Sequence, residues 1–359
     1  IMIQKIFIVF CLGLICIMSF LSRASLALDS ISPSSEASKE VEGIYPRYKI
    51  GTLTYFQYGY EQHNKADKNA FDITRAYLDL KADVSEKIKF RLTPDIGTHF
   101  SSPAKTNYDG SQIFRLKFAF LEFETLSERS RLFLGLHPTP WLAFEEKLNR
   151  YRLQGTMFAE REGFIPGSAD YGIGYIYEFP QNFGEINLSL VNGEGFKSQE
   201  EDKFKSIQTR ATIKPILGLA LTGFYEYGYY KGGGPKDLFI SMLSLQQRYL
   251  TASAQYLNSF DKKIIDRPSS RAIGGSLFLE VKPGGEPEGI ALFSRLDYLD
   301  PDTNKQNDGH LRQIYGIAYW MFYKNVKIGF ALDDEQVIYE SQACSPYEHR
   351  LLAQNQIAF

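Results

Sequence analysis

Hydrophobic and polar residues alternate one by one along many short stretches of the chain. Ile88, Phe90 and Leu92 occupy every second position between residues 88 and 93, and charged or polar residues stand between them. The same pattern recurs over residues 326–333. Side chains of a β-strand point alternately to its two faces, so a period of two predicts strands with one apolar and one polar face.

Sixteen such stretches follow one another to the end of the chain, and the predicted fold class is therefore all-β. They cover about 48–60, 70–82, 88–99, 113–124, 131–136, 171–179, 184–192, 204–214, 217–229, 237–245, 249–260, 271–281, 290–299, 310–322, 326–334 and 348–359. The count falls to fourteen if the weakly patterned stretches 131–136 and 237–245 are not strands. Residues 114–124 are apolar on both faces after Lys117, which a β-bulge would explain.

The connections between these stretches are alternately short and long. Residues 83–87 and 126–130 are short connections, and residues 101–112 and 137–170 are long ones. Outer-membrane barrels have short periplasmic turns and long external loops, and an even number of strands lets the first and last pair. The sequence therefore predicts a transmembrane up-and-down antiparallel β-barrel over residues 48–359. Its polar inner faces predict a water-filled lumen.

The two ends of the chain agree with export. Lys5 precedes an almost wholly apolar run over residues 6–20, and Ala27 ends a plausible cleavage site, so residues 1–27 are predicted to be a signal peptide. A transmembrane helix would need a longer apolar run. The Ser-rich residues 28–47 are expected to be a short periplasmic lead-in. The last stretch alternates up to the terminal Phe359, as a closing strand should.

Composition excludes several functions. Removing residues 1–27 takes away two of the 40 basic residues and none of the 42 acidic ones, which gives a net charge of −4 and no footprint for nucleic acid. Only Cys344 lies beyond residue 27, so no disulfide can form within the mature chain. The five histidines lack metal-ligand spacing, and no nucleophile–base pair is recognisable. We expect no enzyme activity, no cofactor and no metal.

Residues 139–170 form the longest connection, and their aromatic content argues against disorder. They are predicted to fold into the barrel as a constriction; the alternative is an ordered external cap. This loop is predicted to contribute Glu145, Glu146, Lys147, Arg150, Arg152, Glu160, Arg161 and Glu162 to the pore lining. The facing wall is predicted to contribute Arg75, Lys81, Lys89, Arg91, Arg115 and Lys117. The excess of basic residues on this wall predicts a weak preference for anions.

Several short motifs resemble a known family in their order and spacing. They are residues 71–78 (FDITRAYL), 90–95 (FRLTPD), 135–141 (GLHPTPW), 168–172 (SADYG), 191–195 (VNGEG) and 295–300 (RLDYLD). Together with Phe359 they resemble the phosphate-selective porin O and P family of the Gram-negative outer membrane. The resemblance implies a sixteen-stranded trimeric barrel with an inward-folded third loop and anion selectivity from lumenal arginines and lysines. The mixed charge of residues 139–170 departs from that pattern.

The predicted function is passive diffusion of small hydrophilic solutes and ions through a porin. The alternative is a surface-binding barrel, an adhesin or receptor that acts through its external loops. A plugged receptor would need a folded plug, which some twenty residues before the first strand cannot supply. The expected partners are outer-membrane lipid and lipopolysaccharide, two further copies of the chain in a homotrimer, and the barrel-assembly machinery through Phe359.

Overall fold

The computed structural model describes residues 45–62, 68–98, 112–125, 127–200, 203–229, 234–261, 269–341 and 347–359. The predicted signal peptide (residues 1–27), residues 28–44 of the predicted lead-in and Cys344 lie outside the described residues. No helix among the described residues is long and apolar enough to cross a membrane.

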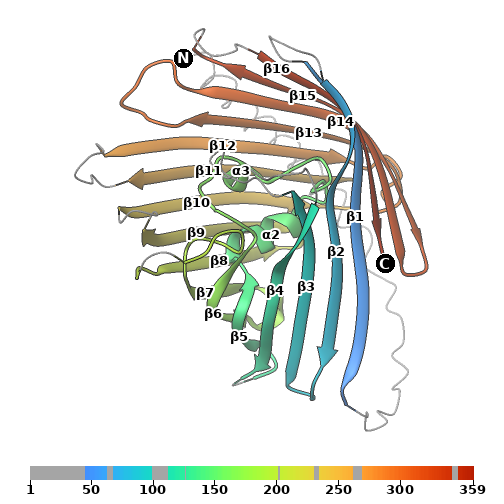
Figure 1. The fold of residues 1–359 in the computed structure, drawn as a ribbon, viewed down its shortest axis with the longest axis vertical. Coiled ribbons are helices and arrows are strands. Elements are labelled where there is room, and N and C mark those ends of the chain that lie inside the picture. The colour runs from blue at the N-terminus through green and yellow to red at the C-terminus, as the bar shows by residue number, and fades with distance from the viewer. Residues whose placement is uncertain are drawn as a thin grey trace. The chain divides into compact units, whose positions relative to one another are not determined.

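Sixteen antiparallel strands form one closed barrel, in which each strand pairs with its neighbours in the chain (Figure 1). The strands are β1 (Arg47–Gln62), β2 (Lys68–Asp83), β3 (Ile88–Thr98), β4 (Gln112–Glu124), β5 (Ser130–Pro138), β6 (Ala169–Glu178), β7 (Gly184–Val191), β8 (Ser206–Ile216), β9 (Leu219–Tyr229), β10 (Pro235–Gln246), β11 (Leu250–Asp261), β12 (Ser270–Val281), β13 (Gly289–Asp300), β14 (His310–Tyr323), β15 (Val326–Tyr339) and β16 (Tyr347–Ala358). The helical elements are α2 (Pro140–Leu148), α3 (Phe158–Arg161) and the 3₁₀ turn η2 (Pro180–Asn182). The predicted count of sixteen is confirmed, and both weakly patterned stretches are strands, β5 and β10.

The last strand closes the barrel on the first. β16 pairs with β15 on one side and with β1 on the other, where Ala358 lies opposite Leu53. One residue further, the backbone N–H of Thr52 donates to the carbonyl of Phe359 (2.8 Å), and the N–H of Phe359 donates to the carbonyl of Thr52 (3.2 Å). Closure leaves no edge strand to pair with another molecule.

The two faces of the strands differ as the alternation predicts. In β15, Phe330 and Leu332 are 49% and 61% exposed, whereas the alternate residues Ala331 and Asp333 are buried. Phe90 on β3 is also exposed, while the next residue, Arg91, lines an internal cavity. The barrel therefore presents apolar side chains outward and most of its polar side chains inward.

A β-bulge explains why β4 departs from simple alternation. Thr93 of β3 lies opposite Phe118, but the next residue, Pro94, lies opposite Leu116, so Lys117 is an extra residue in β4. Both Lys117 and Phe118 are consequently buried inside the barrel. Pro94 has no N–H to donate, and a bulge is one of the few places where a sheet accepts proline.

Candidate functional site

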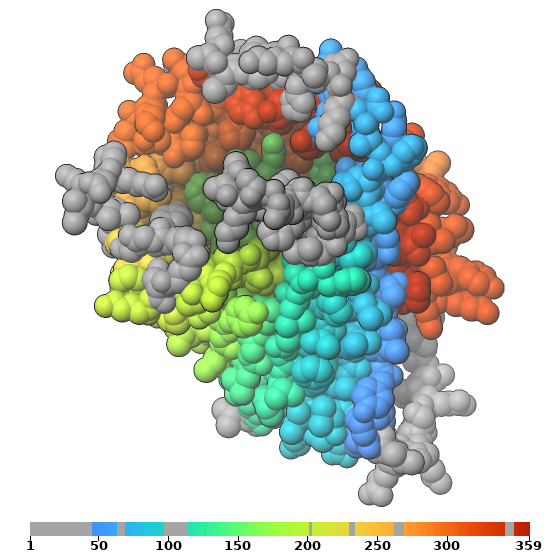
Figure 2. All heavy atoms as spheres, viewed as in Figure 1, coloured from blue at the N-terminus to red at the C-terminus, as the bar shows by residue number. Residues whose placement is uncertain are grey.

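Residues 139–168, which join β5 to β6, form what we call the inserted segment. Thr139 precedes α2 with an extended backbone, and Pro140 occupies the first helical position, where its fixed φ favours the helix. Both helices of the segment lie within the ring of strands (Figure 1). In the space-filling view, green atoms of this part of the chain are recessed between the blue and orange strands (Figure 2). The predicted inward fold is confirmed.

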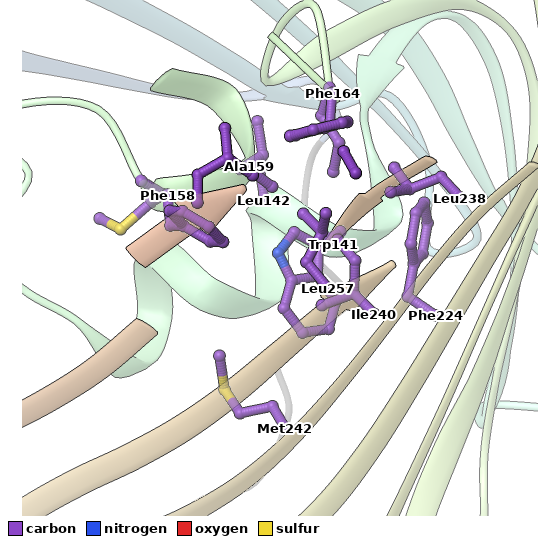
Figure 3. Packing of buried hydrophobic residues seen from close by; sticks show 14 of the residues in the cluster. Trp141, Leu142, Phe158, Ala159, Phe164, Phe224, Leu238, Ile240, Met242 and Leu257 are labelled. Carbon is purple, nitrogen blue, oxygen red and sulfur yellow. The ribbon is translucent and has the colours of Figure 1, made fainter. Parts of the chain in front are cut away.

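An apolar interface holds the inserted segment against one side of the barrel (Figure 3). Trp141 and Phe158 of the segment are completely buried. They belong to one cluster with inward-facing side chains of β9 to β13, including Phe224, Leu238 and Leu257. Burying one large apolar side chain is worth about 1.5–3 kcal/mol, so this interface stabilises the inserted position strongly. The prediction of polar inner faces is wrong for this side, where the inward side chains that meet the segment are apolar.

Polar side chains of four strands fix the backbone of the segment. Arg210 of β8 donates to the carbonyl of Pro140 (2.9 Å), and Lys236 of β10 donates to that of Phe164 (2.8 Å). Two further carbonyls are held by β13 and β16: Arg295 donates to Thr156 (3.0 Å) and Gln354 donates to Leu153 (2.9 Å). A buried carbonyl without a partner is costly, so these donors make the irregular backbone tolerable inside the barrel.

Sequence reasoning did not identify these four donors as functional. The sequence feature that could have identified them is a charged or amide side chain at an inward position of a strand far from the segment in sequence.

A buried ionic network also joins the segment to the barrel wall. Arg312 of β14 lies 2.7 Å from Glu335 and 3.2 Å from Asp297, and Gln154 of the segment donates to Glu335 (3.0 Å).

The opposite wall carries basic side chains set among tyrosines. Lys117 donates to the hydroxyl of Tyr77 (2.6 Å), and its Nζ lies 4.3 Å from the centroid of that ring. The guanidinium carbon of Arg75 lies 5.2 Å from the ring centroid of Tyr77 and 5.7 Å from that of Tyr55. Neither Arg75 nor Lys117 forms an ion pair with a carboxylate among the described residues.

The inserted segment turns a partly neutralised group of charges toward this wall. Arg152 lies 3.0 Å from Glu146 and 2.5 Å from Glu160, and Lys197 lies 3.8 Å from Glu160. Burial alone would raise the pKa of Glu146, but the positive charges of Arg152, Lys117 and Arg75 outweigh it and hold this pKa below its usual value. Glu146 is therefore ionised at neutral pH. The structure brings the charges of Arg75, Lys117, Glu146, Arg152 and Glu160 together.

Other basic residues of the predicted wall are paired locally. Asp79 accepts from Arg91 (2.7 Å) and lies 2.9 Å from Lys81. Asp95 lies 2.9 Å from Arg115, and Glu122 lies 3.9 Å from Lys89. The positive charge of this wall is consequently weaker than a count of its basic residues indicates.

Four residues of the segment do not face the wall, which corrects their predicted placement there. Arg150 lies 2.6 Å from Glu280 of β12, and Glu162 lies 3.2 Å from His310 of β14. Arg161 is held near Arg312 and Glu335. Glu145 is enclosed and accepts from the indole N–H of Trp141 (2.8 Å), and burial raises its pKa to about 7. Arg150 and Glu162 thus pair with β12 and β14, whereas Glu145 stays against Trp141 of its own helix.

A cavity of about 730 Å³ lies between the inserted segment and the wall formed by β1 to β8. It includes residues close to the short turns, such as Glu178 at the end of β6 and Glu185 at the start of β7. Its charged lining consists of Lys81, Arg91, Lys117, Arg131, Lys147 and Arg210 together with Asp79, Glu122, Glu146, Glu178 and Glu185. Among the described residues, no group of three or more His, Cys, Asp or Glu could hold a metal ion.

No protein-family model matches the sequence, and no curated protein matches it. Solved structures do share its fold. The anion-selective porin from Comamonas acidovorans has a TM-score of 0.64 at 9% identity, over 88% of this chain and 100% of that chain. OmpT, an outer membrane protein of Vibrio cholerae, has a TM-score of 0.62 at 9% identity, over 89% and 99%. The outer membrane channel DcaP of Acinetobacter baumannii has a TM-score of 0.60 at 12% identity, over 88% and 97%. The likeness is one of fold.

Proposed function

We propose that this protein is an outer-membrane porin, a passive diffusion channel for small hydrophilic solutes and ions. The observation that carries the proposal is the asymmetric interior of the barrel. One side is sealed by the inserted segment, and the other side keeps a cavity lined by charges. The exposed apolar side chains of the outer face suit a lipid environment, where a closed barrel satisfies every backbone hydrogen bond. We propose that this channel carries out no catalytic chemistry.

Conductance of the refolded protein in a planar lipid bilayer tests this proposal. We expect uniform steps of current when the protein inserts from detergent. A protein that inserts without passing current would contradict the channel. A protein that inserts without current and binds a surface partner would instead favour the adhesin or receptor alternative. No described loop offers support for that alternative.

Selectivity for anions is a finer part of the proposal. Among the described residues, Arg75 and Lys117 of the wall have no carboxylate ion-pair partner, whereas Glu146 of the segment is paired with Arg152. Charges in a narrow lumen are screened less than charges on outer loops, so these groups should outweigh the net charge of the chain. We infer a weak anion preference. The reversal potential across a KCl gradient measures it directly.

The resemblance to the phosphate-selective porin O and P family leads to a further test. If the chain shares that specificity, low concentrations of phosphate should inhibit the chloride current. The mixed charges of the inserted segment argue for general anion passage instead, with phosphate no more inhibitory than sulfate. Side-by-side titration of the two anions separates these cases.

Assembly and location complete the proposal. We propose export by a signal peptide over residues 1–27, residence among outer-membrane lipid and lipopolysaccharide, and insertion by the barrel-assembly machinery through the strand that ends at Phe359. Vibrio cholerae OmpT, which shares the fold, is solved in a trimer form, and we propose a homotrimer here as well. Cross-linking of the native outer membrane would reveal the number of copies.

A further inference from the structure

A row of four rings lines one side of the cavity. Phe118 and Phe120 lie on β4, and Phe133 and His137 lie on the neighbouring β5. The ring centroids are 6.4 Å apart between Phe118 and Phe120, 5.6 Å between Phe120 and Phe133, and 6.2 Å between Phe133 and His137. The bulge at Lys117 brings Phe118 into this row, because it turns that side chain inward. The cavity thus has a continuous aromatic side.

Basic groups border the row at its Phe118 end. The guanidinium carbon of Arg91 lies 4.3 Å from the ring centroid of Phe118, and Nζ of Lys117 lies 5.2 Å from it. Across the cavity, α2 contributes Lys147. This ammonium group forms no ion pair or hydrogen bond with a described residue, and it is exposed.

The acidic groups of the cavity are already engaged. Asp79 is paired with Arg91, Glu146 with Arg152, and Glu185 with Arg210. Glu178 is likewise paired with Arg131. A cationic solute would have to compete with these pairs. An anionic solute finds Lys117 and Lys147, which have no carboxylate ion-pair partner in the described part of the chain.

We propose that the cavity is a binding station for aromatic carboxylates on their way through the channel. The proposal rests on the proposed porin function and names its preferred solute class. The solute ring would stack on Phe118, Phe120 and Phe133, and its carboxylate would pair with Lys117 or Lys147. A small inorganic anion leaves the aromatic side unused, and a neutral ring leaves the ammonium groups without a partner. A volume of about 730 Å³ is ample for a single-ring solute.

Partial block of the KCl current by added solute tests the proposal. Benzoate carries both features, acetate only the carboxylate, and phenol only the ring. We expect benzoate to reduce the current at a concentration about tenfold lower than either control requires. If the protein conducts and benzoate is no more effective than acetate or phenol, the proposal is wrong. If the protein does not conduct at all, the porin function itself fails.

Three variants locate the site. Phe120→Leu keeps an apolar side chain but removes the ring, and Lys147→Gln removes the charge. Each should raise the half-blocking concentration of benzoate about three- to tenfold, and Phe120→Leu should leave the acetate value unchanged. Phe90→Ala removes a ring from the outer face and should behave as the unaltered protein. Block that is indifferent to both inner variants would overturn the assignment, provided that their KCl conductance shows normal folding.

Discussion

Nε of Arg152 lies 3.0 Å from a carboxylate oxygen of Glu146, and both residues belong to the inserted segment. The segment thereby neutralises part of its own negative charge before that charge can act on Arg75 and Lys117 across the passage. The preference of the channel should then depend on this internal pair more than on the total number of acidic residues. The pair can be tested one charge at a time.

Replacing Arg152 with Gln should turn the weak anion preference into a preference for cations. Glu146 and Glu160 would both lose their closest positive partner, and their less neutralised carboxylates would attract K⁺ into the passage. The sign of the reversal potential across a KCl gradient measures the change. Glu146→Gln in the Arg152→Gln background should move the potential back toward the value of the unaltered protein. Glu145→Gln is the matched control and should shift it little, since Glu145 is enclosed against Trp141. An Arg152→Gln channel that remains anion-selective would contradict this account.

Trp141→Ala should loosen the inserted segment without opening the barrel. Truncating a completely buried tryptophan costs about 3–5 kcal/mol, and here the loss falls on the contact between segment and wall. We expect a larger and noisier single-channel conductance, while the heat-dependent mobility of the folded barrel on gels is retained. Tyr171→Ala removes an exposed aromatic side chain of β6 and serves as the control. An unchanged conductance in Trp141→Ala would mean that the segment does not limit the current.

The docking of the segment should weaken as pH rises from about 4.5 to about 7. Burial raises the pKa of Glu145 from 4.5 to about 7, so the docked state binds its proton more tightly than the undocked state does. Stability from this group is therefore complete below the ordinary pKa and is lost as pH rises through the raised pKa. Single-channel recordings between pH 4 and pH 8 should show more frequent fluctuations at the higher pH. Glu145→Gln, which carries no charge at any pH, should remove this dependence. Fluctuations that vary equally in the variant would exclude Glu145 as their origin.

Adjacent positions of β7 should respond oppositely to the same new charge. Leu188 is 41% exposed on the outer face, whereas Asn187 is buried and lines the cavity. An arginine facing lipid near the bilayer midplane costs about 2–4 kcal/mol, so Leu188→Arg should reduce the yield of folded outer-membrane protein. Asn187→Arg places the same side chain in a polar, roomy cavity and should assemble normally. Equal yields of the two variants in membrane fractions would contradict the assigned faces.

The contributions of the Phe359 backbone and of the Phe359 ring to assembly can be measured separately. Deleting Phe359 removes both hydrogen bonds with Thr52, and we expect a lower membrane yield with accumulation in the periplasm. Phe359→Ala keeps those bonds and removes only the ring. An equally poor yield of Phe359→Ala would assign the effect to recognition of the ring during assembly, and a normal yield would assign it to closure. Normal assembly after deleting residues 356–359 would disprove the role of β16 in closing the barrel.

The sequence was informative where one face of a strand is apolar and the other is polar. Alternation placed most strands, and the order of short and long connections predicted the up-and-down topology. The same pattern was weak at β10, where Phe239 faces outward while Leu238 and Ile240 face the inserted segment. A strand that is apolar on both faces carries no period of two. This property made β10 a weak prediction and also concealed the apolar side of the barrel interior.

The sequence indicated which segment contributes to the site, but less well which side chains contact one another there. Residues 139–170 stood out by length and aromatic content, and the charge of Lys117 acts on Glu146 of this segment. Glu145 differs from Glu146 by one position, yet it faces Trp141 instead of the wall. Which neighbour on a short helix faces the passage depends on how that helix packs. This packing involves β9 to β13, which lie 50 or more residues away in sequence.

The four carbonyl contacts of the inserted segment constrain the order of events during biogenesis. Their donors lie on β8, β10, β13 and β16, so the complete set exists only after the C-terminal strand has joined the barrel. Sealing of the seam between β16 and β1 and final narrowing of the passage must therefore be late and concurrent steps. A barrel arrested before its seam closes would make only some of the hydrogen bonds that hold the inserted segment. For the proposed porin, closure of the barrel and narrowing of its interior would then be completed together.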